Sequence, residues 1–238
     1  CAEPFASAFW KTAGLYARCD NLTAEAKGEF VTVRANYTLP DGQTLPIDFA
    51  IDGAGRCDIT MTWQGEHTEL PEFGLLFPLR RELTEVSYLG LGPRETTADR
   101  TAGGKMGVWN YNVRQDFAQY TPVYPQECGS RTGVYSATVT GSIPGIGFAG
   151  DGMTFSALPY TPHELENARH LYELPRDDSK TVVRCAAFQR GVGGDNSWGA
   201  KPHADDCFAV EKGTSFRFMI PKIKIHFGLI AKPSQDKN

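Results

Sequence analysis

The sequence of 238 residues lacks the features that mark several large protein classes. No stretch approaches the roughly 18 uninterrupted apolar residues of a membrane-spanning helix. The first residues also lack the basic region and apolar run of a signal peptide. Basic residues are not in excess, since 24 Lys and Arg stand against 28 Asp and Glu and the net charge is −4. A nucleic-acid-binding domain usually carries a basic surface stripe, so the charge argues against a nucleic-acid partner.

Motifs for metal, redox and nucleophilic chemistry are missing as well. The six cysteines show no CxxC spacing, and the five histidines show no HExxH or other paired metal spacing. No GxSxG nucleophile motif is present. In a domain of this size, widely scattered cysteines favour buried free thiols over disulfides.

What the sequence does contain is frequent turn residues and hydrophobic alternation. It has 25 glycines and 15 prolines, and its apolar residues mostly recur with period two. Many short strands joined by turns predict an all-β fold, a large antiparallel sandwich in a single domain over residues 1–238. The predicted strands are Phe30–Thr38, Leu45–Ile51, Cys57–Trp63, Phe73–Leu79, Glu85–Tyr88, Gly133–Val139, Thr154–Leu158, Thr181–Gln189 and Ser215–Ile220.

Few segments have helical signals. Thr161 is suited to a helix N-cap, Pro162 to the first helical position and Glu164 to the third, which together predict one short helix with a capping box. The stretches Gly90–Tyr124 and Gly191–Asp206 have no strand pattern. Long irregular segments in a compact β domain are usually functional loops or interfaces.

Two charged segments invite a catalytic interpretation. Glu95 and Asp99 in PRETTADR form a carboxylate pair of the kind used in glycosidic chemistry, but the flanking arginines favour ion pairs that hold a loop. Glu127 and Arg131 in YPQECGSRTG predict an ion pair for the same reason.

The most distinctive segment is GVGGDNSWG, residues Gly191–Gly199. Its pattern is neither a dinucleotide fingerprint nor a phosphate-binding loop. Its glycines can take positive φ, and Asp195, Asn196 and Ser197 can bond back to the loop backbone. Trp198 then either stands at the rim as a platform for the apolar face of a sugar, or packs into the core.

Several segments together resemble one family. YLGLGPRETTADR resembles YxGxGPxENYxDR, YTPVYPQECGSRTG resembles YVxPQENGxRxx, and GVGGDNSWG resembles GxGGDDSWG of the lac-operon type β-galactosidases in glycoside hydrolase family 2. FSALPYTPHELENARHLYEL and the opening FWKTAGLY are similar to segments of the same family. The match runs in the family's order from about Phe9 to about Ile220, and it is to the C-terminal domain, also encoded as a separate small chain.

The resemblance implies a fold for this chain and places the family's catalytic residues on another domain. The fold would be that domain's antiparallel β-supersandwich, which is similar to galactose mutarotases, with its first strands preceding Cys1 and with a C-terminal strand and tail over 221–238. The family's two catalytic glutamates lie on a TIM barrel, as do its magnesium ligands. At 238 residues of β pattern, this chain has no room for a barrel of about 250 residues. No catalytic residue, metal ligand or cofactor of this chain itself is therefore expected, and magnesium and sodium would belong to absent domains.

The resemblance also implies a site and partners. Trp198 occupies the motif position whose tryptophan lines the substrate pocket and stacks on the sugar, and Asn196 replaces the second Asp of GGDDSW. The residues expected to support it are Gly193, Gly194, Asp195, Asn196 and Ser197. Expected partners are a galactoside and a TIM-barrel domain or large subunit, within an oligomeric, cytoplasmic enzyme; the periplasm is the alternative location.

The leading hypothesis is therefore the C-terminal domain or small subunit of a retaining β-galactosidase, with the isolated chain inactive. Two alternatives stay open. A stand-alone carbohydrate-binding module would bind sugar without a partner chain. An aldose epimerase of the mutarotase type would need a histidine acid and a glutamate base in one cleft.

Overall fold

The computed structural model describes residues 8–120, 124–196 and 200–222, and these form an eleven-stranded antiparallel sheet. The nine predicted strands all coincide with observed ones, which confirms the all-β antiparallel prediction. The strands are β1 (Arg18–Lys27), β2 (Phe30–Thr38), β3 (Thr44–Asp52), β4 (Cys57–Thr62), β5 (Glu72–Arg80), β6 (Leu83–Gly92), β7 (Lys105–Asn112), β8 (Arg131–Gly141), β9 (Ile146–Leu158), β10 (Lys180–Gln189) and β11 (Ser215–Ile220).

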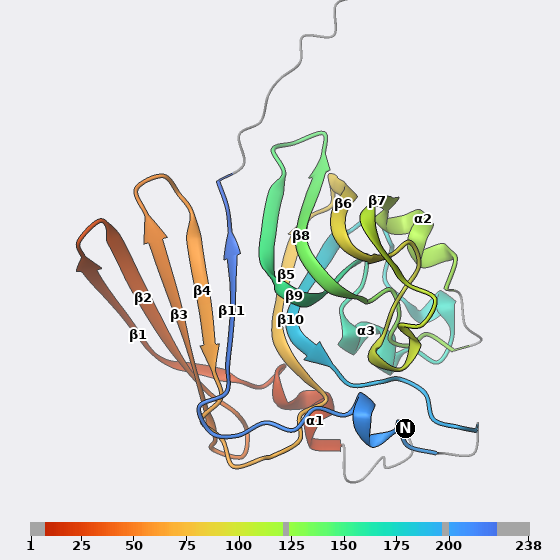
Figure 1. Ribbon diagram of the computed structural model, residues 1–238, viewed down its shortest axis with the longest axis horizontal. Coiled ribbons are helices and arrows are strands. Elements are labelled where there is room, and N and C mark those ends of the chain that lie inside the picture. The colour runs from red at the N-terminus through yellow and green to blue at the C-terminus, as the bar shows by residue number, and fades with distance from the viewer. Residues whose placement is uncertain (1–7, 121–123, 197–199, 223–238) are drawn as a thin grey trace, which may run out of the picture.

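The sheet bends so that distant strands share one core. Its order is β1-β2-β3-β4-β11-β9-β8-β6-β7, with β10 joining β9 to β5. In Figure 1, β1–β4 and β11 fan out on the left, and β5–β10 curve on the right with two of the three described helices, while the first helix lies below the sheet. Phe77 of β5 lies 5.9 Å, centroid to centroid, from Phe218 of β11, although these two strands do not pair. The hydrophobic effect thus folds the sheet onto itself, as a sandwich requires.

A smaller hydrophobic cluster lies around two of the three described helices. It contains Phe117, Cys128, Leu158, Tyr160 and Leu165, each less than 9% exposed. These residues come from four separate chain segments, so the cluster anchors the loops on that side of the sheet to the sandwich. The loop that precedes β8 is held there by the Cys128 side chain.

The predicted helix is confirmed, but it is not alone. Helix α3 (Pro162–Asn167) begins at Thr161 with the complete capping box, in which Thr161 Oγ1 accepts a hydrogen bond from the Glu164 N–H at 3.1 Å. The expectation of one short helix is wrong, because α1 (Ala8–Ala13) and α2 (Val113–Ala118) also form. Asn112 caps α2 by accepting bonds from the next turn's N–H groups, a signal that sequence reasoning missed.

The expectation that Gly90–Tyr124 is irregular is wrong too, because it contains β7 and α2. β7 was missed because it has apolar side chains on both faces: Trp109 packs toward the core while Val108 points out, 67% exposed. β1 was missed because its alternating apolar residues, Leu22, Ala24 and Ala26, include only one large side chain. Residues 223–238 of the predicted C-terminal strand and tail lie outside the described residues.

The prediction of free thiols is confirmed where the structure can test it, but their expected burial holds for Cys128 and Cys185 and is wrong for the exposed Cys19 and the half-buried Cys57 and Cys207. Cys19, Cys57, Cys128, Cys185 and Cys207 are all unpaired. A domain of this size buries enough apolar surface to be stable without covalent links.

Candidate functional site

The glycine-rich loop leaves the end of β10 and is tied down at several points. The Gly193 N–H donates to Asp99 Oδ2 at 2.8 Å, and the Gly191 N–H donates to the Asp206 carbonyl at 2.9 Å. Asp195 Oδ1 lies 2.8 Å from His203 Nε2. The outgoing and returning halves of the loop are therefore joined twice, by the Gly191–Asp206 hydrogen bond near β10 and by the Asp195–His203 contact further along.

The glycines of this loop serve close packing rather than unusual backbone angles. The expectation of positive φ is wrong for Gly191, Gly193 and Gly194, none of which has positive φ. A Cβ on Gly194 would instead lie 2.3 Å from the Ala200 carbonyl oxygen, and one on Gly191 would lie 3.1 Å from the Asp99 Cβ. Only glycine fits at position 194, because the backbone of this part of the loop lies so close to the backbone at Ala200.

Asp99 is charged at its contact with the loop. Burial raises the pKa of this carboxyl, but the Thr97 hydroxyl and the N–H groups of Gly193 and Val192 outweigh burial, so the pKa is lowered. An ionised carboxylate accepts hydrogen bonds from N–H groups more strongly than a neutral acceptor does. Asp99 thus works as a brace between the turn η1 (Ala98–Arg100) and the loop.

The structure describes four of the six predicted site residues. Gly193, Gly194, Asp195 and Asn196 lie together on the described part of the loop, whereas Ser197 and Trp198 lie outside the described residues. The side chain of Asp195, which was predicted to bond back to the loop backbone, contacts the side chain of His203. That contact raises the pKa of His203, through a hydrogen bond and charge attraction.

A pocket of about 220 Å³ adjoins the first residues of this loop. Most of its lining side chains are polar, and both charge signs are present. They come from the segment after β6, the end of α2, the segment before β8 and the loop itself. The lining residues are Glu95, Thr97, Arg100, Tyr120, Gln126, Glu127, Cys128 and Val192.

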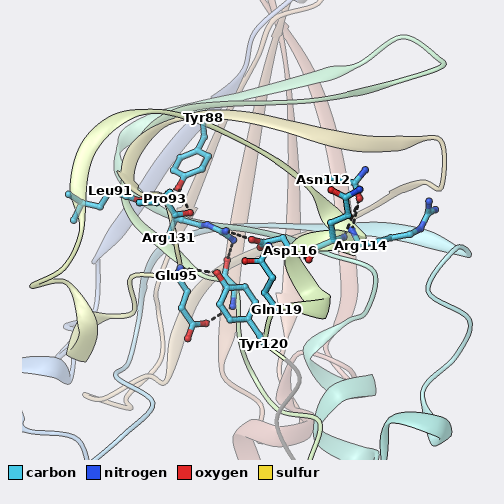
Figure 2. Close-up of polar contacts among 12 residues, drawn as sticks. Tyr88, Leu91, Pro93, Glu95, Asn112, Arg114, Asp116, Gln119, Tyr120 and Arg131 are labelled. Atoms are coloured by element: carbon cyan, nitrogen blue, oxygen red, sulfur yellow. Dashed lines mark hydrogen bonds and ion pairs between the residues drawn. The ribbon is translucent and has the colours of Figure 1, made fainter.

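Glu95 is held in a structural role on the pocket wall. Its Oε2 accepts the Gly129 N–H at 2.8 Å, and its Oε1 pairs with Arg100. Its own N–H donates to the Tyr120 hydroxyl at 3.0 Å, as Figure 2 shows. The prediction of an arginine partner is confirmed for Glu95. Asp99 binds backbone N–H groups instead, so both carboxylates are engaged in structural contacts.

The predicted Glu127–Arg131 ion pair is wrong. Glu127 binds Arg184 of β10 with both oxygens, at 2.9 and 2.8 Å. Arg131 begins β8 and instead donates to Asp116 Oδ1 of α2 at 2.8 Å. Local spacing cannot show these pairs because the partners lie 57 and 15 positions apart.

Both arginines are buried, at 1% and 0% exposure for Arg184 and Arg131. The guanidinium carbon of Arg131 lies 4.2 Å from the centroid of the Tyr111 ring, and Figure 2 shows it reaching toward Asp116. Burial lowers the pKa of Arg131, but Tyr111 and Asp116 raise it more, so the charge is kept. The sequence signal for such a role is an arginine inside an apolar strand, as Arg184 is in TVVRCAAF.

The charged side chains of this region are engaged in ion pairs and hydrogen bonds within the chain. Burial raises the pKa of the Cys128 thiol to about 12, so it is not a nucleophile at neutral pH. No group of three or more His, Cys, Asp or Glu able to hold a metal ion occurs among the residues that the structure describes. Within the same residues, no helix has the length and apolar character needed to cross a membrane.

Comparison with known proteins decides the family. Residues 3–220 match the family described as beta galactosidase small chain. The chain belongs to this family. It is 31% identical to the beta-galactosidase small subunit of Latilactobacillus sakei, over 83% of this chain and 72% of the subunit.

Longer relatives carry a similar segment. Over 89% of this chain, it is 36% identical to a beta-galactosidase of Lactobacillus delbrueckii subsp. bulgaricus. Over 91% of this chain, it is 33% identical to a beta-galactosidase of Streptococcus thermophilus. It covers only 21% and 22% of those two proteins. This member of the small-chain family therefore spans about a fifth of the length of such relatives.

Proposed function

We propose that this chain is the small-chain part of a retaining β-galactosidase that hydrolyses terminal β-D-galactosides such as lactose. Its task is to bind and orient the sugar, with Trp198 as the stacking surface. Retaining hydrolysis needs two carboxyl groups, one as nucleophile and one as acid and then base. We assign both to glutamates outside this chain, because Glu95, Asp99 and Glu127 are all engaged in structural contacts.

The observation that carries this proposal is the braced loop. A stacking side chain contributes to affinity only if its loop is held in place before the sugar arrives, since ordering a loose loop costs free energy. The Asp99 carboxylate binds the Gly193 N–H, and the Asp206 carbonyl accepts the Gly191 N–H. Both contacts hold loop residues that precede Trp198 in the sequence. A loop whose only role was to connect two strands would not need an ionised carboxylate bound to its backbone.

The association with a TIM-barrel domain or large subunit is part of the same proposal, and so is an oligomeric enzyme. Mg²⁺ and Na⁺, if the enzyme uses them, would be held by those other parts. The epimerase alternative finds no support, because no histidine lines the described pocket next to its glutamates. A stand-alone binding module differs in one respect: it would bind galactose tightly as an isolated chain.

Replacing Trp198 by leucine tests the proposed role directly. In the assembled β-galactosidase we expect kcat/KM for a chromogenic galactoside to fall about tenfold or more, because the sugar loses a large aromatic contact surface. Thermal unfolding should be unchanged. The isolated chain should show no hydrolysis; hydrolysis that a substitution in this chain abolishes would contradict the proposal, as would unchanged kinetics of the leucine variant.

Replacing Asp99 by alanine tests the brace. The Gly193 N–H loses its acceptor, and we expect kcat/KM of the assembled enzyme to fall by about 10- to 100-fold because Trp198 is no longer well placed. Asp178→Ala is the matched control, since this aspartate makes an exposed ion pair with Arg176.

A double-substitution cycle separates positioning from general damage. If Asp99 acts through Trp198, its removal should cost little further activity in the Trp198→Leu background. Fully additive losses would show that Asp99 does not act through this tryptophan.

A further inference from the structure

One face of the outer strands is apolar, and no residue of 8–120, 124–196 or 200–222 covers it. Leu22 of β1, Val31 of β2 and Ile51 of β3 are 66%, 45% and 38% exposed. Ala24 and Ala26 of β1 are exposed on the same face. These five residues are called the outer apolar face below.

Strand register joins this face to the core. Ala24 pairs with Val33, Val33 with Phe49, Phe49 with Ile59, and Ile59 with Phe218. Along this row the side chains pass from exposed at Ala24, through half-buried at Val33 and Phe49, to 1% and 2% exposed at Ile59 and Phe218. The outer apolar face is thus a continuation of the core surface that loses its cover toward β1.

The opposite face of the same strands is polar. The neighbouring row runs from Thr23 through Arg34 and Asp48 to Thr60. Arg34 Nε and Asp48 Oδ1 form an exposed ion pair at 2.6 Å. Alternation of this kind, apolar on one face and polar on the other, is the pattern of a sheet with one buried face. The sequence of β1–β3 is therefore suited to a cover on the apolar face alone.

The strand β1, which carries most of the outer apolar face, also forms one edge of the sheet. Among the described residues β1 pairs only with β2, and it lies outermost on the left of Figure 1. A ten-residue strand that leaves its edge and an apolar face exposed is a site for pairing and packing with other polypeptide. Its charges, Arg18, Asp20, Glu25 and Lys27, are balanced, so they do not select a strongly charged partner.

The chemistry of the face argues for a protein layer. Its side chains are aliphatic, with no aromatic platform for a sugar. The chain spans about a fifth of its longer β-galactosidase relatives and 72% of the L. sakei small subunit, so much polypeptide of such enzymes lies outside it. We propose that the outer apolar face is covered by β-galactosidase polypeptide that lies outside this chain and presents an apolar surface of its own. This rests on the proposed function for the identity of the partner.

Cysteine accessibility tests the proposal on one pair of neighbours. Leu22→Cys and Thr23→Cys place a thiol on opposite faces of β1, and maleimide modification of each peptide is followed by mass spectrometry. In the isolated chain both should react at similar rates. In the assembled β-galactosidase, modification at 22 should slow by roughly tenfold or more, because it then requires local opening. The rate of modification at 23 should change less than about twofold, because the thiol on the polar face can react without local opening. Equal reactivity at both positions in the assembled enzyme would overturn the proposal.

A charge at the same two positions tests assembly. Leu22→Lys should weaken association with the rest of the enzyme by roughly tenfold or more, since it buries an ammonium group in an apolar contact. Thr23→Lys is the matched control and should assemble normally. Because Leu22 is exposed in the isolated chain, both variants should fold, which circular dichroism checks.

The outcomes also separate the partner from the function. Normal assembly of Leu22→Lys would overturn the proposed cover. An isolated chain that dimerises, and loses the dimer with Leu22→Lys, would show that the face binds a second copy and would overturn the proposed partner. Protection at position 22 in an assembly that does not hydrolyse galactosides would refute the proposed function but leave the docking surface intact.

Discussion

Replacing Asp116 by alanine should lower the free energy of unfolding by about 3–5 kcal/mol. Arg131 is fully buried, and an arginine guanidinium is not deprotonated in proteins, so it stays charged when the carboxylate is removed. Its remaining contacts, the Gly129 carbonyl and the Tyr111 ring, carry no full negative charge. A buried cation without a counter-ion is among the most costly defects in a folded chain. Urea unfolding of the variant and the parent chain measures the difference.

Two further variants make this result specific. Asp48→Ala removes the exposed Arg34–Asp48 pair and should cost less than about 1 kcal/mol, because exposed ion pairs contribute little. Asp116→Leu combined with Arg131→Met should recover much of the loss, since two apolar groups need no counter-ion. A loss at Asp116→Ala no larger than at Asp48→Ala would show that the buried pair does not stabilise the fold.

Replacing Gly194 by alanine should lower kcat/KM of the assembled β-galactosidase by about 100-fold, if the loop positions Trp198 as proposed. The added Cβ would lie 2.3 Å from the Ala200 carbonyl oxygen and 2.6 Å from the Lys201 carbonyl oxygen. Both are backbone atoms, so the two sides of the loop must separate to relieve the clash. Steady-state kinetics with a chromogenic galactoside measures the effect.

The control for this substitution is Gly103→Ala, where an added Cβ meets nothing within 4 Å. It should leave kcat/KM unchanged. Unfolding of the isolated chain should be similar for both variants, because the loop lies outside the main core. A Gly194→Ala enzyme with parental kinetics would contradict the placement of the sugar-binding residue on this loop.

The charged segments show where prediction from sequence stops. Their residue types made ion pairs the expected outcome, and Glu95 does pair with Arg100, five positions away. Glu127 and Arg131 lie just as close in sequence, yet each takes a distant partner. Whether two nearby charges meet depends on which strands approach their segment, and no local pattern encodes that approach.

The glycine-rich loop shows the same limit in another form. Its composition predicted a tight loop, and the structure has one. The reason for its glycines is close approach to Ala200 and Asp99 rather than positive φ. The braces, Asp99 and His203, lie 94 and 8 positions from the loop residues they bind and were not singled out for that task.

The sequence by itself determined the all-β class, nine of the strands, the capped helix and the family resemblance. Each of these depends on alternation, capping or motif identity, which act between residues close in the chain. The tertiary structure alone decided the ion-pair partners, the brace on the loop and the edge position of β1. β1 escaped prediction because its alternating apolar residues, Leu22, Ala24 and Ala26, include one large side chain and two alanines, which give a weak strand signal. Long-range packing assigns those features, because burial and counter-charges come from whichever segment the fold brings alongside.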